Sequence, residues 1–252
     1  MATPGMLNAV LMRILSGLEK SYGKQASPYP DDPYEMILYT NCGYPATDAS
    51  CVRAFDALAR EVGLRPGKIL AAPAEKLTAI MRLGGILPEL RAARLQEIAA
   101  LVQTEFGGDL RTALKQPLPE ARKALKRFPT IGDPGADKIL LFSQTAPVAA
   151  VPSNCLHVPL RLGYGEEKKN YAASYRSVQE AIQAELPAEC GALIRAYLLL
   201  KRHGQELCKR SRPLCERCPV SSACAYFNRM SGSRSTAAPP TPSRTGSPRR
   251  SR

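Results

Sequence analysis

Long uninterrupted apolar runs are missing from this chain of 252 residues. None approaches the ~18 residues that a membrane-spanning helix needs, so we expect no role in a membrane. Residues 7–18 are partly apolar, but Arg13 interrupts them and no small-residue cleavage site follows, so we expect no signal peptide. Strand patterns are nearly absent as well, because the short apolar run 148–151 stands between Pro147 and Pro152. The sequence therefore predicts an all-α protein.

Apolar residues recur at helical spacing in five stretches: 7–18, 52–62, 95–106, 171–186 and 192–202. Thr47 or Asp48 is a candidate N-cap for the second stretch, because short polar side chains accept hydrogen bonds from the first free amides of a helix. The stripe that begins with Tyr171 and Tyr175 is assigned to the core, like the other apolar stripes.

Histidine is scarce, with only His157 and His203, and neither has an evident partner. We expect both to be structural or surface residues. Cysteine is not scarce. Four of the eight cysteines are scattered without the spacing of a disulfide framework: Cys42, Cys51, Cys155 and Cys190. A reducing compartment and metal binding fit this pattern better than disulfides.

The other four cysteines, Cys208, Cys215, Cys218 and Cys224, follow the pattern C-x6-C-x2-C-x5-C. Short loops can bring such closely spaced sulfurs around one metal centre. Thiolates are soft ligands that suit zinc or an iron–sulfur cluster. The spacing differs from the bacterial ferredoxin run and from the paired C-x2-C of zinc ribbons.

Acidic residues are absent from the last 22 residues, 231–252, which carry five arginines and contribute to a formal net charge of +13. A basic chain with a basic end predicts a polyanionic partner, most simply nucleic acid. The segment consists largely of Ser, Pro, Thr, Gly and Arg, so it cannot bury enough apolar surface to fold. We expect a disordered tail that adds phosphate contacts or serves only as a solubilising extension.

The stretch 128–138, FPTIGDPGADK, reads as the end of one helix, a short glycine-containing turn and the start of another. It predicts a helix–hairpin–helix motif at about 120–142. Three further segments accompany it and the cysteine loop: ATDASCVRAF at 46–55, LRAARLQEIAALVQTEFGGDL at 90–110 and VPSNCLHVPLRLGY at 151–164.

Together with LLLKRHGQEL before the first clustered cysteine, these segments resemble the endonuclease III-type DNA glycosylases over most of residues 30–227. The resemblance implies two helical domains with a DNA cleft between them. One domain spans 31–147, and 148–230 forms the other together with the N-terminal helix in 1–30. It also implies double-stranded DNA as partner, a [4Fe-4S] cluster on the four clustered cysteines, and removal of a damaged base flipped from the duplex. A location in the cytoplasm at the nucleoid, or in a eukaryotic nucleus, follows from it, and no oligomer is implied.

The same resemblance implies DNA contacts. Hairpin amides would grip a phosphate as helix N-termini do, and the cysteine loop would present basic side chains. The candidates are Thr130, Ile131, Gly132, Gly135 and Lys138 in the hairpin and Lys209, Arg210 and Arg212 in the loop. Asn41 or Tyr44 would fill the gap left by a flipped base, or pack on the protein as ordinary loop residues.

The family's two catalytic positions are both proline here. Pro134 stands where the family has a nucleophilic lysine, and Pro152 where it has an aspartate. Proline supplies neither an amine nor a carboxylate. An N-cap at Asp133 with Pro134 in the first helical position is the structural interpretation, and the Asp133 carboxylate would then compete with a phosphate for the same amides.

Three hypotheses follow. The first is a DNA-binding protein that recognises damaged or distorted duplexes with glycosylase activity lost or altered. The second is an active glycosylase that uses a displaced residue, Lys138 or Asp137. The third is a zinc-stapled interaction module.

Overall fold

The computed structural model describes residues 4–43 and 47–235, and within them every regular element is helical, which confirms the all-α prediction. The α-helices are α1 (Pro4–Tyr22), α2 (Pro33–Asn41), α3 (Asp48–Glu61), α4 (Pro66–Ala71), α5 (Ala74–Met81), α6 (Pro88–Glu105), α7 (Leu110–Ala113), α8 (Leu118–Leu125), α9 (Asp133–Phe142), α10 (His157–Leu162), α11 (Tyr171–Glu185), α12 (Cys190–Glu206) and α13 (Ala225–Ser235). Short 3-10 turns are η1 (Arg82–Gly84), η2 (Ser153–Cys155), η3 (Cys215–Arg217) and η4 (Ser221–Ala223).

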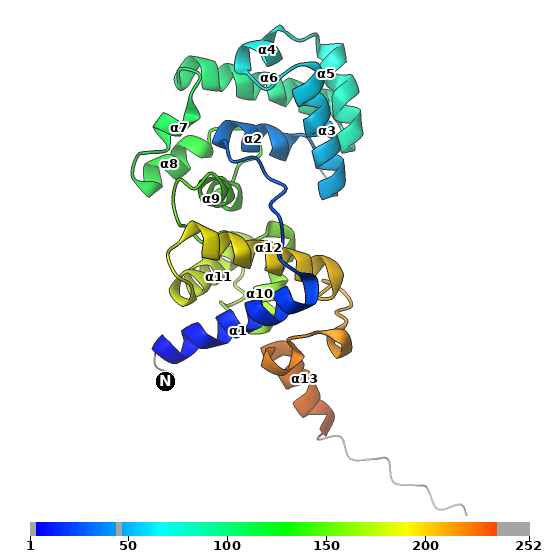
Figure 1. The fold of residues 1–252 in the computed structure, drawn as a ribbon, viewed down its shortest axis with the longest axis vertical. Helices are drawn as coiled ribbons and strands as arrows, with labels where there is room; N and C mark the ends of the chain where they lie inside the picture. The colour runs from blue at the N-terminus through cyan, green and yellow to red at the C-terminus, as the bar shows by residue number, and fades with distance from the viewer. Residues whose placement is uncertain (1–3, 44–46, 236–252) are drawn as a thin grey trace, which may run out of the picture.

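The helices form two groups that lie one above the other (Figure 1). Helices α2 to α9 make the first group, in which α4 and α5 pack along α6. Helices α10 to α13 make the second group, and α1 joins it by packing on α11 and α12. The segment 23–32 then crosses to α2, and α9 contacts α12 across the junction.

The predicted start of α3 is confirmed by its cap. The Thr47 hydroxyl accepts a hydrogen bond from the Ser50 amide at 3.2 Å, and the helix begins at Asp48. Such a cap stabilises a helix by about 1 kcal/mol, because it satisfies an amide that has no partner within the helix. The sequence signal works here because the capping contact is local.

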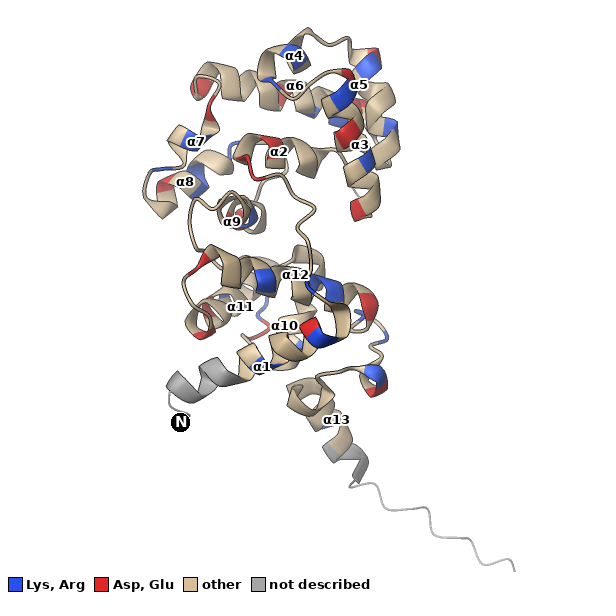
Figure 2. Ribbon diagram, viewed as in Figure 1, with Lys and Arg blue, Asp and Glu red and all other residues tan. Residues whose placement is uncertain are grey.

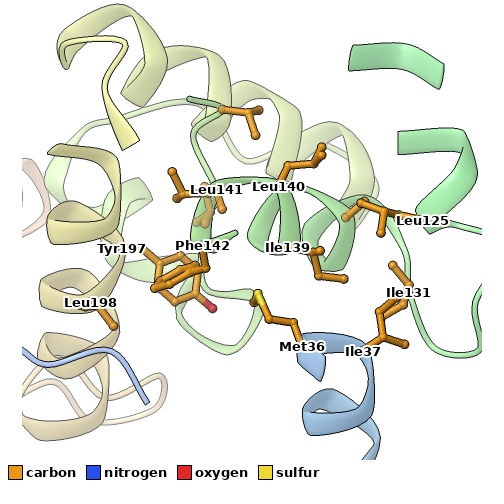
Figure 3. Packing of buried hydrophobic residues seen from close by; sticks show 14 of the residues in the cluster. Met36, Ile37, Leu125, Ile131, Ile139, Leu140, Leu141, Phe142, Tyr197 and Leu198 are labelled. Atoms are coloured by element: carbon orange, nitrogen blue, oxygen red, sulfur yellow. The ribbon is translucent and has the colours of Figure 1, made fainter. Parts of the chain in front are cut away.

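Side chains of α2, α9 and α12 meet in the core between the two groups (Figure 3). Met36 and Ile139 are at most 1% exposed. Phe142 packs against Tyr197 with ring centroids 5.1 Å apart and nearly perpendicular planes. Burying a large apolar side chain stabilises the fold by roughly 1.5–3 kcal/mol, so this junction holds the groups together.

A buried arginine organises the corner between α5 and α6. Arg91 is 2% exposed, and its guanidinium donates to the carbonyl oxygens of Cys42, Met81, Gly85 and Ile86 at 2.5 to 2.9 Å. At Gly84 an added Cβ would lie 1.7 Å from one of these carbonyl oxygens, so no other residue fits there. The corner is therefore rigid.

Charged residues are distributed over both groups of helices, with Lys and Arg on each (Figure 2). None of the described helices is long and apolar enough to cross a membrane. The predicted disordered tail begins too early, because α13 continues to Ser235 and takes in the first five residues of the range 231–252. The remaining tail residues, 236–252, and Tyr44 lie outside the described residues.

Candidate functional site

The hairpin between α8 and α9 is built around a left-handed residue, Thr130, whose φ is 67°. The Ile131 amide closes the turn by donating to the Phe128 carbonyl oxygen at 3.2 Å. Helix α9 then starts at Asp133 with Gly132 as its N-cap, and Pro134 occupies the second helical position. The predicted N-cap at Asp133 is therefore wrong by one residue. Pro134 still loses no hydrogen bond, because the first amides of a helix have no acceptor within it.

Three backbone amides at this helix start point to no acceptor within the described residues: those of Gly132, Asp133 and Gly135. The Asp133 carboxylate does not compete for them, because it accepts from Lys126 Nζ at 2.8 Å instead. The predicted amide of Ile131 is not available, since the turn uses it. Free amides at a helix N-terminus form an anion site, because the amides and the helix dipole both favour negative charge.

The hairpin forms one wall of an open cleft, which we call the hairpin cleft. Its lining comes from both groups of helices and includes Asn41, Arg94, Thr130, Gly132, Pro134, Gly135, Lys138, Ser153, Asn154, Tyr171 and Arg210. No acidic residue among the described ones lines it. A cleft with one sign of charge concentrates ligands of the opposite sign, here a polyanion.

Asn41 lines the hairpin cleft but does not project into it. Its side chain is 2% exposed, donates to the Ile37 carbonyl oxygen at 3.0 Å and accepts from the Thr130 hydroxyl at 3.3 Å. Insertion into a duplex would break both bonds. In this structure Asn41 therefore fixes the hairpin on α2, which favours the alternative that it packs on the protein.

Lys138 reaches the junction between the two groups. Its Nζ lies 3.4 Å from Thr40 Oγ1 and 4.9 Å from the centre of the Tyr29 ring. Lys201 stacks on the same ring at 5.0 Å and is bound to Asp48 at 2.7 Å. Burial and the charge of Lys201 lower the pKa of Lys138 to about 8. At pH 7 roughly a tenth of this amine is therefore neutral, and thus nucleophilic, which is far more than for an ordinary lysine.

The neighbouring Asp137 faces away from the hairpin cleft into the protein. Its carboxylate is 1% exposed and accepts from Arg122 Nε at 2.7 Å, Tyr175 Oη at 3.0 Å and Gln179 Nε2 at 2.6 Å. All three donors come from surrounding helices, so the carboxylate ties α8, α9 and α11 together. A residue this enclosed has no access to a ligand in the cleft.

The two prolines at the expected catalytic positions differ in placement. Pro134 lines the hairpin cleft, whereas Pro152 is buried and serves as the N-cap residue of η2. Ser153 and Asn154, which follow Pro152, are exposed and line the cleft. The backbone thus still presents this segment to the cleft, without a carboxylate.

The four clustered cysteines line one cavity between α10, α12 and α13. Among the described residues, no group of three or more His, Cys, Asp or Glu is arranged to hold a single metal ion. Burial raises the pKa of Cys208, Cys215 and Cys218, and the charges of the other clustered thiolates add to this. Four thiols that line one cavity supply soft donors, which suit zinc or an iron–sulfur cluster.

Three residues hold the cysteine loop in place: Arg161, which the sequence did not single out, and the two histidines, for which structural or surface roles were expected. Arg161 donates to the carbonyl oxygens of Lys209 and Arg210, both at 2.7 Å. His157 Nε2 is 2.7 Å from the Cys208 carbonyl oxygen. His203 contacts Cys218 Sγ at 3.7 Å, and burial lowers its pKa to about 4. No local pattern indicates such long-range contacts.

The basic residues of the cysteine loop separate into two kinds. Arg210 is exposed and lines the hairpin cleft, so the loop and the hairpin share one site. Lys209 and Arg212 are also exposed but do not line the cleft, and the Lys209 ammonium contacts the Gln205 carbonyl oxygen. Of Lys209, Arg210 and Arg212 in the cysteine loop, only Arg210 therefore lines the same cleft as the free amides.

Known proteins are similar to this chain in sequence. Endonuclease III of Sulfolobus acidocaldarius is 26% identical over 77% of this chain and 82% of its own length. Thymine-DNA glycosylase of Aeropyrum pernix is 24% identical over 89% of this chain and 96% of its own. No family model matches the chain.

Solved structures agree on the fold. A non-covalent endonuclease III–DNA complex superposes with a TM-score of 0.70 at 20% identity, covering 92% of this chain and all of that one. A thermostable thymine-DNA glycosylase also gives 0.70 at 20% identity, covering 89% of this chain and 98% of that one. The sequence relatives and the shared fold together make the chain similar to the endonuclease III-like DNA glycosylases.

Proposed function

We propose that this protein binds double-stranded DNA at damaged or distorted positions and has lost or altered the base-release chemistry of its family. The observation that carries the proposal is the hairpin cleft, where free amides of Gly132, Asp133 and Gly135 adjoin a lining without acidic residues. Backbone amides grip phosphates without reading sequence, so they position a duplex rather than select one.

The altered chemistry is inferred from the lining itself. Pro134 faces the hairpin cleft without an amine, and Pro152 is buried without a carboxylate. Neither carboxylate of the same helix lines the cleft, because Asp133 pairs with Lys126 and Asp137 is enclosed by its three donors. A cation developing at a sugar would therefore meet no described carboxylate in this cleft.

The proposed phosphate grip is tested by Asp133→Pro against Asp133→Ala. Proline suits the first helical position and removes one of the three free amides, whereas alanine keeps the amide. Both variants lose the ion pair with Lys126, so the comparison isolates the amide. A hydrogen bond to a charged group contributes roughly 1.5–3 kcal/mol, so we expect at least tenfold weaker duplex binding for the proline variant. Equal binding by the two variants would count against the grip.

We also propose that the four clustered cysteines hold a [4Fe-4S] cluster. Their shared cavity and soft thiolate donors support it. Within the proposal the cluster orders the loop that carries Arg210. Iron and sulfide analysis with a broad visible absorption band would support a cluster, whereas a colourless protein containing zinc would support the zinc-stapled alternative.

A second candidate function is favoured by Lys138, which lines the hairpin cleft and has a lowered pKa. In this alternative its neutral amine attacks the aldehyde carbon of a ring-opened abasic sugar, and water leaves with the carbonyl oxygen to give an imine. Borohydride would reduce that imine to a stable protein–DNA adduct. An adduct with the unmodified protein but not with Lys138→Arg would favour this alternative, and no adduct with either would exclude it. The burial of the other displaced candidate, Asp137, argues against its use.

A further inference from the structure

Tyr171 does not lie in the core, although its apolar stripe predicts that it should. It begins α11 and is 46% exposed, whereas Tyr175, one turn later, is 2% exposed. Tyr171 lines the hairpin cleft and also a second groove beside it. An aromatic ring left half-exposed on the wall of a charged cleft has a cost in water, which a ligand with a flat apolar face would remove.

The Tyr171 ring is supported by Tyr175, one turn later on the same helix. It stacks on Tyr175 with ring centroids 6.3 Å apart and planes inclined by 27°. Tyr175 is itself fixed, because its hydroxyl donates to Asp137 Oδ2 at 3.0 Å. The helix start is capped by Asn170, which accepts from the Ala173 amide at 2.8 Å. The ring is therefore a supported platform.

Arg210 lies beside this platform. It lines both the hairpin cleft and the second groove together with Tyr171. Its charge acts on the phenol, opposing the burial that raises the pKa of Tyr171. The Arg210 backbone is anchored by Arg161, but its side chain is exposed. A flat apolar ring with an adjacent cation matches a nucleobase with its attached phosphate.

We propose that Tyr171 stacks against an unpaired nucleobase of the duplex bound in the hairpin cleft, with Arg210 contacting the phosphate of the same nucleotide. The proposal rests on the proposed function and adds to it the residue that senses the unpaired base. A paired base is stacked within its own duplex and has no free face, so Tyr171 discriminates unpaired from paired DNA.

The chain contains no tryptophan, which allows a direct test. Tyr171→Trp introduces a single indole whose emission responds to stacking. We expect a duplex with one unpaired base to quench this emission, and the same duplex fully paired or with an abasic nucleotide at that position to leave it nearly unchanged. Equal quenching by all three duplexes would overturn the proposal.

Affinity gives the second readout. Tyr171→Leu keeps an apolar side chain against Tyr175 but removes the ring, whereas Tyr171→Phe keeps the ring. Stacking of one base contributes about 1–3 kcal/mol, so we expect Tyr171→Leu to weaken binding of the duplex with the unpaired base roughly 5- to 100-fold. Binding of the paired duplex stays within about twofold, and Tyr171→Phe behaves as the unmodified protein.

The outcomes separate the two proposals. If the unmodified protein prefers the duplex with the unpaired base and Tyr171→Leu keeps that preference, the stacking proposal fails and the proposed function stands. If the unmodified protein binds none of the duplexes, both fail. If Tyr171→Leu weakens all duplexes equally, Tyr171 supports the fold of the site and does not contact a base.

Discussion

The cysteine cavity and the hairpin cleft retain different parts of the family pattern. The cavity keeps all four of its cysteines, and long-range contacts from Arg161, His157 and His203 surround them. The cleft keeps its hairpin and free amides, but proline occupies both expected catalytic positions. The cysteines and the hairpin backbone thus match the expected pattern where two expected side chains do not, so under the proposed function DNA binding and base-release chemistry are separable in this fold.

The largest loss of stability is expected for a substitution in the cysteine cavity. Cys218→Ser removes one soft ligand from the four, and a metal centre bound only by the folded state contributes its binding energy to folding. We expect loss of bound iron and the largest drop in the free energy of unfolding among the variants considered. Cys190→Ser, at a free cysteine outside the cavity, is the matched control. Unchanged iron content in Cys218→Ser would contradict a metal centre held by these four cysteines.

The second-largest loss of stability is expected for a change at Asp137, the buried carboxylate on α9. Asp137→Asn weakens the pair with Arg122, whose side chain is 29% exposed, and turns an amide NH2 toward buried donors, which costs about 1–3 kcal/mol. Asp133→Asn on the same helix breaks the pair with Lys126, in which both side chains are 45% exposed, and costs at most about 1 kcal/mol. Urea unfolding of the two variants measures the difference. Similar losses in both would show that Asp137 is not the structural anchor described above.

The smallest change in stability is expected for a substitution of Lys138, and this change depends on pH. Its folded-state pKa of about 8 lies below the ordinary lysine value, so the unfolded chain binds more protons and stability rises as pH increases from about 8 to about 10.4. Lys138→Met removes this penalty, and we expect stabilisation of about 1 kcal/mol at pH 7, less than the pKa shift alone implies because methionine loses the ammonium's contacts with the Tyr29 ring and Thr40.

The gain from Lys138→Met should fade above pH 8 and vanish near pH 10.4, because the unmodified lysine is then neutral in both states. Lys123→Met, at a lysine on α8 that does not line the hairpin cleft, is the control and should show no such pH dependence. A gain for Lys138→Met that is constant from pH 7 to pH 10.4 would contradict the lowered pKa.

Local signals in the sequence were sufficient for much of the fold. Thr47 caps α3 as predicted, because the contact spans only three residues. The apolar stripes placed the long helices for the same reason. The predicted cap at Asp133 failed because the carboxylate found Lys126 across the hairpin turn, a partner that the pattern of one segment does not reveal.

The candidate site was less predictable. Cysteine spacing placed the four thiols in one cavity, since short loops constrain them. Tyr171 was assigned to the core because its spacing matches that of Tyr175, and periodicity does not reveal that a helix start can overhang a cleft. The fate of Asn41 depended on Thr130, 89 positions away in the chain, so no local pattern could indicate it.

Arg91 at the corner between α5 and α6 supplies a positive charge that is covalently part of the chain. Its guanidinium is surrounded by four carbonyl oxygens, a set of ligands that loops in other proteins offer to calcium. A bound calcium can be stripped by a chelator, and an iron–sulfur centre depends on the supply of iron and on oxidants. Arg91 also lines the hairpin cleft, and a covalent guanidinium depends on neither, so we expect this wall of the cleft to keep its shape whether or not the cysteine loop holds a metal centre.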